Sequence, residues 1–323
     1  MIVVLTGGTG GAKFVDGLRQ VVPQQDLTLI VNTADDLEWW GLHISPDIDS
    51  VTYVLAGLLN EERGWGLAGD TFHCVQAMRQ LGQPAWFNSG DRDLATHLFR
   101  AQLLKEGKTL AEATAVIAAR RNVQARILPM SNERVETRVD TPVGELSFEE
   151  YFVKRWFQDP VKAVRYSGVE SASPAPGVIE AIKEASVILL APSNPITSIA
   201  PILSVPGIRE TLRQASAPIV AVSPIVGNDA VSGPAGVLMA AQGLPVSIAG
   251  VAQAYDDLLE VLVVDNKDAA AAEELQKSGY RVLCTNTIMR SAEDRIELAR
   301  TVLSAASGES AAAPAPAPAP EQT

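Results

Sequence analysis

Residues 2–21 read IVVLTGGTGGAKFVDGLRQV, and this stretch decides the fold. The apolar run from Ile2 to Leu5 predicts a short strand that is buried on both faces, as strands of parallel sheets are. A glycine-rich loop follows, and the residues from Phe14 to Val21 have the pattern of an amphipathic helix. A strand, a glycine-rich loop and a helix in this order are typical of an α/β protein that binds phosphate at the loop.

The loop itself contains the first candidate binding residues, because glycines let backbone N–H groups approach a ligand closely. The spacing differs from a P-loop, which needs Gly-Lys followed by Ser or Thr, and from a clean G-x-G-x-x-G. A tight structural turn is the alternative, and Lys13 is either a phosphate ligand or an exposed residue of the first helical turn. The candidates for nucleotide binding are Gly7, Gly8, Thr9, Gly10, Gly11 and Lys13.

A second strand, Leu27 to Val31, leads into the acidic stretch NTADDLEWWGLHISPDID at residues 32–49. Ser45 is expected to cap a helix that runs from Pro46 to about Leu59. Acidic side chains on loops at the end of a strand suit a divalent metal and a phosphorylated ligand. A solvated acidic loop with a helix cap is the alternative. The candidates here are Asn32, Asp35, Asp36, Asp47 and Asp49.

The position of two of these acids predicts different roles for them. Asp47 and Asp49 are two residues apart on the predicted helix, so they lie about 200° apart around its axis. They therefore need not do the same job: one can serve the helix dipole while the other faces the site.

Another candidate pair lies at the start of a later helix, in Gly90-Asp91-Arg92-Asp93. Asp91 is expected to cap this helix. Arg92 can grip a phosphate with its planar fork or pair with a neighbouring acid. His97 fits a packed helix residue better than a ligand. Four of the five tryptophans fall within the first 86 residues, where ordinary packing is preferred over a stacking wall for a flat ligand.

The middle of the chain departs from the α/β alternation. A capping box at Thr109 predicts a helix to about Arg121. Strand-like stretches follow at residues 125–128, 135–139 and 144–148. We therefore expect an inserted α+β region at about residues 100–175.

The α/β alternation returns from about Val178, and two further strands end in polar turns. Strand Val187 to Leu190 precedes Ser193 and Asn194, both candidates for nucleotide binding, and a later strand ends before Ser223. Ligands of open parallel sheets bind at the carboxyl ends of the strands. The loops that start at residues 6, 32, 192 and 223 should therefore converge on one anionic-ligand site.

The expected fold is a Rossmann-like three-layer α/β sandwich with a mostly parallel sheet. Residues 1–306 should form a single domain, and the Ala/Pro-rich residues 307–323 a disordered tail. The net charge of −12 argues against nucleic-acid binding. No apolar run approaches a membrane span or a signal peptide. Cys74 and Cys284 indicate neither a disulfide framework nor a metal site, so the expected compartment is the cytoplasm.

Seven motifs, in order, carry a resemblance to a known family. They are GGTGGAK, NTADDLEWWGLHISPDID, GWG, GDRDLATH, PMSNERVET, PSNPITSI and SPIVGNDAVSGPAG, which span residues 7–236. The chain from Met1 to about Leu303 resembles the 2-phospho-L-lactate transferase family of coenzyme F420 biosynthesis. The Rossmann-like fold of that family, with its insertion, agrees with the fold expected from the residues.

The resemblance implies a phosphodiester transfer that requires Mg²⁺. A phospholactyl group, or an enolpyruvyl-phosphoryl group in bacterial members, moves from a guanosine-diphosphate donor to a deazaflavin, and GMP leaves. The acceptor is the ribityl hydroxyl of 7,8-didemethyl-8-hydroxy-5-deazariboflavin. The family pattern places the deazaflavin contact on Asp49 and Arg92. We expect Asp49, Asp36 and Arg92 to be the catalytic residues, with Asp91 and Asn32 as further substrate contacts. Asp47 and Asp49 are the expected metal ligands, and a homodimer is the default assembly.

Two other functions remain as alternatives. A non-catalytic nucleotide-sugar-binding regulator of the same superfamily would have a Gly/Ser-rich stretch after the paired Asp, where this chain has Leu37-Glu38-Trp39-Trp40. An NAD-dependent oxidoreductase would need a clean G-x-G-x-x-G, which is absent, and an acid that ends the second strand.

Overall fold

The computed structural model describes residues 1–308. The predicted tail starts at Ser307, which here ends the last helix, and the remainder of that tail lies outside the described residues. Among the helices of residues 1–308, none combines the length and the apolar composition that a membrane span requires.

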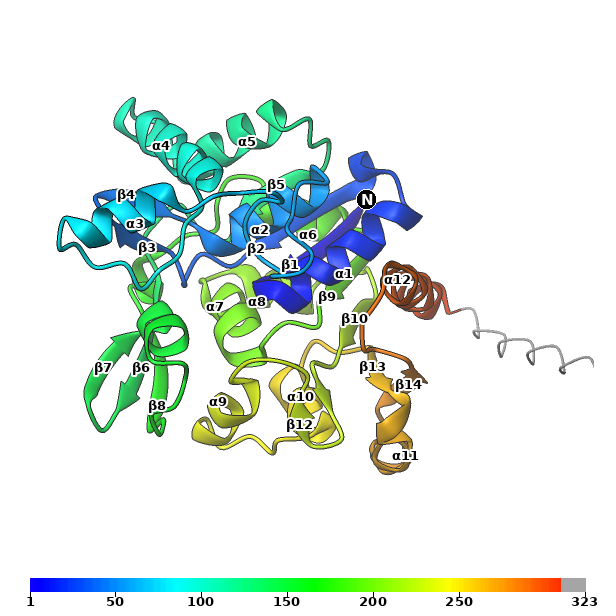
Figure 1. Ribbon diagram of the computed structural model, residues 1–323. Helices are drawn as coiled ribbons and strands as arrows, with labels where there is room; N and C mark the ends of the chain where they lie inside the picture. Colours follow the sequence, from blue (N-terminus) through cyan, green and yellow to red (C-terminus); the bar gives the residue numbers. More distant parts are fainter. Residues whose placement is uncertain (309–323) are drawn as a thin grey trace, which may run out of the picture.

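The main sheet of the described chain has seven strands, all parallel to their neighbours (Figure 1). Its order is β14-β13-β10-β9-β1-β2-β5. The bounds are β1 Ile2–Thr6, β2 Leu27–Val31, β5 Arg126–Pro129, β9 Val187–Leu190, β10 Ile219–Val222, β13 Val261–Asp265 and β14 Arg281–Thr285. Strands β2 and β5, which follow β1 in the sequence, extend the sheet on one side of β1, and β9 pairs with the other side of β1. The junction of β1 and β9 is thus the topological switch point, where ligands bind in this class of fold.

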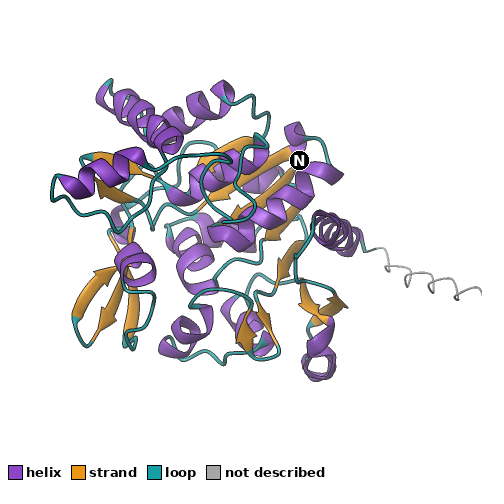
Figure 2. Cartoon of the chain, viewed as in Figure 1, coloured by secondary structure: helices purple, strands orange, loops and turns teal. Residues whose placement is uncertain are grey.

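Helices cover both faces of the sheet and confirm the predicted three-layer α/β sandwich (Figure 2). Alternate residues of each strand enter different cores: Val4 packs with α1, α2 and α12, whereas Val3 and Leu5 pack with α6, α8, α10 and α11. The helices are α1 Gly8–Val21, α2 Pro46–Leu55, α3 His73–Gln80, α4 Asp91–Lys105, α5 Leu110–Arg120, α6 Val178–Glu184, α7 Ala200–Ser204, α8 Ile208–Arg213, α9 Ala235–Ala241, α10 Ile248–Ala254, α11 Ala269–Lys277 and α12 Ala292–Ser307.

A second sheet forms a lobe beside the first, with the antiparallel order β7-β6-β8 (Figure 1). Its strands are β6 Glu136–Thr141, β7 Gly144–Ser147 and β8 Ala163–Ser167, and the π-helical segment η2, Glu150–Lys154, follows β7. The strand expected at residues 125–128 does not belong to this lobe. It is β5, and it pairs with β2 at the edge of the main sheet. We call residues 136–167 the inserted lobe.

Two short hairpins complete the strands of the described chain. One is β11 Ile225–Val226 with β12 Asp229–Ala230. The other is β3 Leu37–Trp39 with β4 Leu42–Ile44, within the acidic stretch. Trp40 and Gly41 form its turn with φ values of 53° and 76°. Positive φ at both turn residues suits the twist of a two-residue hairpin, although Trp is an unusual residue there.

Candidate active site

The glycine-rich residues form the first turn of a helix, so the prediction that the helix begins at Phe14 was wrong. Helix α1 begins at Gly8, directly after β1, with Gly7 as its N-cap. A Cβ atom on Gly10 would collide with the carbonyl oxygen of Pro192, and one on Gly11 would lie 2.6 Å from Ser193 Oγ. The glycines therefore let α1 start in contact with the loop that follows β9.

Hydrogen bonds join this turn to the other strand ends. The hydroxyl of Ser193 donates to the carbonyl oxygen of Gly7 at 2.7 Å. The N–H of Gly8 donates to Asp47 Oδ1 at 2.7 Å, and Asn32 Nδ2 donates to Asp47 Oδ2 at 3.0 Å. The predicted convergence of the loops after β1, β2 and β9 is confirmed by these contacts. In the fourth loop, the Ser223 hydroxyl donates to the carbonyl oxygen of Ile225 at 2.9 Å, and the convergence of this loop with the other three stays a prediction.

The remaining nucleotide-binding candidates lie around the same turn. Thr9 is exposed, and the backbone N–H groups of Thr9 and Gly10 belong to the helix start, where no intrahelical acceptor exists. Lys13 is half-buried one turn further along, and its ammonium makes no ion pair or hydrogen bond with residues 1–308. Asn194 caps a short π-helical segment, η4 Pro195–Ile199, by accepting from the N–H of Ile196 at 2.9 Å.

Four carboxyl groups gather beside the helix start: Asp35, Asp36, Asp47 and Glu149, which we call the acidic cluster. Burial is the largest cause that raises their pKa values, and repulsion from neighbouring carboxylates adds to it for Asp35, Asp47 and Glu149. The pKa of Asp36 is raised by burial alone, against the opposing effect of His43, Ser45 and Arg100. The pKa of Asp47 rises to about 6, although hydrogen bonds from Asn32 and Gly8 oppose the shift. The pKa of Glu149 rises to about 8 through burial and then through Asp47 and Asp36. The pKa of Asp35 lies well above its usual value.

Asp36 is held by two neighbours from the β3-β4 hairpin and its exit. Its Oδ2 accepts from the Ser45 hydroxyl at 2.6 Å and lies 2.9 Å from His43 Nε2. The prediction that Ser45 caps α2 was therefore wrong, since its hydroxyl faces Asp36 and no side-chain cap forms. Asp36 Oδ1 and Asp35 Oδ1 are both buried without a hydrogen-bond partner in residues 1–308.

Asp49 belongs to a separate set of contacts, which we call the Asp49 network. Its carboxylate pairs with the guanidinium of Arg100, a fully buried side chain. Its other oxygen lies 3.5 Å from His97 Nδ1, and His97 Nε2 lies 3.3 Å from Asp93 Oδ2. Tyr53 donates to Asp93 at 2.6 Å. The structure thus directs Asp47 and Asp49 to different partners, as their angular separation predicted.

The acidic cluster and the Asp49 network differ as possible cation sites. Ligand atoms of Asp49, Asp93 and His97 lie within 4.8 Å of one another, but Arg100 already supplies positive charge to Asp49. The acidic cluster has buried oxygens without partners and no Lys or Arg ion pair within residues 1–308. The chemistry of its donors, carboxylate oxygens, is the chemistry that Mg²⁺ prefers. The acidic cluster therefore has the charge and the donor chemistry that a divalent cation needs, whereas the close spacing of three ligand atoms is found, within residues 1–308, at Asp49, Asp93 and His97.

The Asp91-Arg92 pair has a role in the structure that the sequence did not indicate. Asp91 does not cap its own helix; its Oδ1 accepts from the N–H of Cys74 at 2.9 Å and thereby caps α3. Asp70 in turn accepts from the N–H groups of Arg92 and Asp93 at the start of α4. The Arg92 side chain is exposed and donates to the carbonyl oxygen of Ala68 at 2.8 Å.

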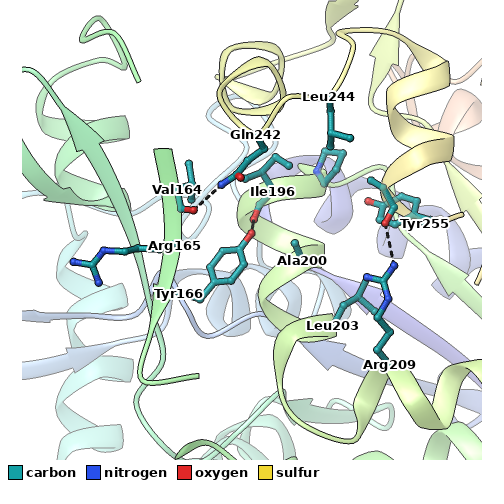
Figure 3. Close-up of a pocket in the computed structure, with 12 residues that line it drawn as sticks. Val164, Arg165, Tyr166, Ile196, Ala200, Leu203, Arg209, Gln242, Leu244 and Tyr255 are labelled. Carbon is teal, nitrogen blue, oxygen red and sulfur yellow. Dashed lines mark hydrogen bonds between the residues drawn. The ribbon is translucent and has the colours of Figure 1, made fainter. Parts of the chain in front are cut away.

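Two cavities lie near these groups. One, of about 320 Å³, is lined by Asp36 and His43 together with Lys108 and Arg134. The other, of about 300 Å³, lies between β8, η4 and α10 (Figure 3). There Tyr166 donates to the carbonyl oxygen of Ile196 at 2.5 Å. The first cavity adjoins the acidic cluster and gives a ligand access to it.

A parallel sheet with a glycine-rich helix start and buried acids at its switch point is typical of α/β proteins that bind phosphorylated ligands. The family model described as 2-phospho-L-lactate transferase CofD matches residues 2–302. This chain belongs to the 2-phospho-L-lactate transferase family, as the resemblance predicted.

Named relatives and a solved structure agree with this assignment. The chain is 42% identical to a 2-phospho-L-lactate transferase of Methanococcoides burtonii, over 94% of this chain and 98% of that protein. It is 44% identical to a phosphoenolpyruvate transferase of Streptomyces griseus, again over 94% of this chain and 98% of that protein. A crystal structure of an UPF0052 family member from Bacillus halodurans covers 94% of this chain and 99% of its own. At 18% identity and a TM-score of 0.64, that structure supports the fold.

Proposed function

We propose that this protein transfers a phospholactyl or enolpyruvyl-phosphoryl group from a guanosine-diphosphate donor to 7,8-didemethyl-8-hydroxy-5-deazariboflavin. The observation that carries the proposal is the contact of the α1 start with the buried carboxylate of Asp47 at the switch point, in a chain of the 2-phospho-L-lactate transferase family. The relatives include both 2-phospho-L-lactate and phosphoenolpyruvate transferases at similar identity. Both donors are therefore included in the proposal.

The donor diphosphate would bind at the first turn of α1. The N–H groups of Thr9 and Gly10 point out of the helix start, where the helix dipole favours negative charge. Lys13, which has no partner in residues 1–308, supplies a positive charge one turn away. Ser193 and Asn194 fix the loop that contacts this turn.

Mg²⁺ would be held by Asp47 and Asp35, whose carboxylates lie beside the α1 start. When bound, such a cation neutralises negative charge on a diphosphate and makes GMP a better leaving group. The structure gives Asp49 a different neighbour, Arg100, so we move the second metal-ligand role from Asp49 to Asp35.

The acceptor would be oriented by Asp49, with Arg92 at the rim, as the family resemblance implies. Asp36, held by Ser45 and His43, has one free buried oxygen and would take the proton of the attacking ribityl hydroxyl. The hydroxyl oxygen forms a bond to the phosphorus that carries the three-carbon group, and the bond from that phosphorus to the bridging oxygen of GMP breaks. Asn32 positions Asp47 and Asp35 through its amide.

An assay with purified protein tests the proposal. The deazaflavin, Mg²⁺ and either the lactyl or the enolpyruvyl donor are mixed, and the products are separated and weighed by mass spectrometry. A new deazaflavin phosphodiester with an equal amount of GMP is expected with one of the donors. If neither donor reacts and a uridine nucleotide-sugar binds tightly, the regulator is the better assignment.

Asp47→Asn and Asp49→Asn separate the two proposed roles in that assay. Asp47→Asn should lower kcat by 100-fold or more (~3 kcal/mol), because it removes a charge that stabilises the transferring phosphate. Asp49→Asn should raise KM for the deazaflavin and leave KM for the donor unchanged.

A homodimer and a cytoplasmic location are retained as proposals. Light scattering of the purified protein tests the homodimer.

A further inference from the structure

The cavity of about 320 Å³ beside Asp36 lies where two neighbouring strands of the main sheet end. Thr33 lies two residues beyond β2 and Asn132 three residues beyond β5, and both line the cavity. The N–H of Met130 donates to the carbonyl oxygen of Val31 at 2.9 Å and holds the two strand ends together. The β3-β4 hairpin and the connection between α4 and α5 supply the other walls.

Two residues that line this cavity each keep a buried oxygen without a hydrogen-bond partner within residues 1–308. The atoms are Oγ1 of Thr33, a residue that is 3% exposed, and Oδ1 of Asp36. The N–H of Asp36 donates to the carbonyl oxygen of Thr33 at 3.3 Å, so one turn of the chain carries both side chains. Buried polar atoms in folded proteins are nearly always hydrogen-bonded. The unpartnered pair therefore indicates a ligand with hydroxyl or amine groups.

The opposite wall of the cavity offers donors. Asn132 Oδ1 accepts from the N–H of Ala111 at 2.9 Å, which orients the side-chain amide and leaves its NH₂ group without an acceptor in the described chain. The exposed side chains of Lys108 and Arg134 add further N–H donors. A hydroxyl group is both a donor and an acceptor, so a chain of hydroxyls can satisfy the two kinds of wall together.

The charges around the cavity favour a neutral ligand. Asp36, Glu38 and Glu133 face Lys108 and Arg134, with His43 beside Asp36, so positive and negative groups nearly cancel. This balance differs from the start of α1, where the helix dipole favours an anion. The volume lies at the lower end of the range for small-molecule sites, which suits a short chain better than a fused ring system.

We propose that this cavity receives the ribityl chain of the acceptor, with Thr33, Asp36 and Asn132 as its hydrogen-bond partners. The inference rests on the proposed function, which names the acceptor, and deepens it by giving the chain a subsite of its own. A chain anchored by Thr33 and Asn132 lies against Asp36, whose free oxygen is the one proposed to take the proton of the attacking hydroxyl.

The test compares Thr33→Val with Thr114→Val in the full-length protein. Thr114 is also buried with an unpartnered hydroxyl, but it lies on α5 and does not line the cavity. Titration calorimetry measures the affinity for the deazaflavin and for the same ring system with a methyl group in place of the ribityl chain. Thr33→Val should weaken binding of the ribityl compound about three- to tenfold and leave binding of the methyl compound unchanged. Thr114→Val should change neither.

Neither valine variant should lower the melting temperature, because neither hydroxyl has a protein partner to lose. A loss of ribityl binding without a loss of stability is a result that a purely structural role of Thr33 cannot produce. Asn132→Asp gives a second variant, since it keeps the oxygen that accepts from Ala111 but removes the NH₂ donor. It should also weaken binding of the ribityl compound and not that of the methyl compound.

Several outcomes would overturn the inference and leave the transferase proposal intact. One is wild-type affinity of Thr33→Val for the ribityl compound, and another is an equal weakening for both ring compounds. If Thr33→Val instead weakens binding of the guanosine-diphosphate donor, the cavity belongs to the donor. Failure of the wild-type protein to bind the deazaflavin at all is a different result, because it contradicts the proposed function itself.

Discussion

The Asp49–Arg100 pair is the most deeply buried ion pair among residues 1–308. Removal of one partner of a buried pair leaves an uncompensated charge and typically costs about 3–5 kcal/mol. Arg100→Met should therefore lower the free energy of unfolding in urea by about that amount. Arg281→Met removes an exposed pair with Glu260 and should cost under about 1 kcal/mol. Equal effects of the two substitutions would mean that Arg100 does not compensate Asp49.

Several site residues could be predicted individually from the sequence, and others could not. Asn32 and Ser193 follow strands that are recognisable as buried apolar runs, and the rule for parallel sheets brings such strand ends together. Asp47 was predicted from its place at the start of a helix in the acidic stretch. Asp93, His97 and Arg100 recur at helical spacing on α4, and this spacing predicts that they share one face of the helix. The interpretation of His97 as a packing residue did not use that signal. Glu149 gives no signal, because only the packing of the inserted lobe brings it to the site.

At the scale of elements, the contact of α1 with the loop after β9 depends on residues without side chains. Gly10→Ala places a methyl group against the carbonyl oxygen of Pro192 and should push α1 away from that loop. Thr9→Ala, at an exposed position of the same turn, changes no such contact. Gly10→Ala should therefore lower the stability by about 1–3 kcal/mol and weaken donor binding at least tenfold. Urea unfolding and donor titration check this, and an unchanged stability would mean that the contact is dispensable.

The starts of α3 and α4 are capped by acidic side chains from other segments, Asp91 of α4 for α3 and Asp70 of the preceding loop for α4, and both caps should be measurable. Asp70→Ala and Asp91→Ala each remove acceptors of N–H groups at a helix start, at a typical cost of about 1 kcal/mol. The cost of the double substitution should differ from the sum, because both carboxylates accept hydrogen bonds from Thr71. If Asp91→Ala instead left stability unchanged and raised KM for the deazaflavin, the predicted substrate contact would be its main role.

The strands were predictable where burial alone determines the pattern. Strands β2 and β9 match the expected bounds, and β10 ends before Ser223 as expected, because a strand buried on both faces is one uninterrupted apolar run. The start of α1 was missed because glycines have low helix propensity, and packing against Pro192 overrides that preference. Hairpin β3-β4 was missed because Trp40 occupies a turn position that normally holds Asn or Gly.

At the scale of the whole molecule, the acidic cluster makes stability depend on pH. Unfolded carboxyl groups have pKa values of about 4, whereas burial and mutual repulsion raise the pKa of Asp47 to about 6 and that of Glu149 to about 8. Between about pH 4 and 8 the folded protein thus binds more protons than the unfolded chain, and its stability falls as pH rises. Groups with lowered pKa values, such as Asp257 at about 2, affect stability only below that window.

The expected result is a lower urea midpoint at pH 8.5 than at pH 5 for the protein in EDTA. The raised pKa of His43 contributes in the same direction, since the stability it adds is lost as the imidazole deprotonates. Mg²⁺ should reduce the difference by compensating the ionised carboxylates. A midpoint that stays constant or increases between these pH values would show that the acidic cluster does not repel itself in the folded state.

The position of β1 in the middle of the sheet has a consequence for synthesis. Its second neighbour, β9, pairs Val187 with Ile2, so the ribosome delivers the two partners 185 residues apart. At a synthesis rate of about 5–20 residues per second, this leaves one edge of an apolar strand open for roughly 10–40 s. An open apolar edge is a template for pairing with other chains. The nascent protein is therefore most vulnerable to aggregation before β9 emerges, and slow translation of the inserted lobe would prolong that interval.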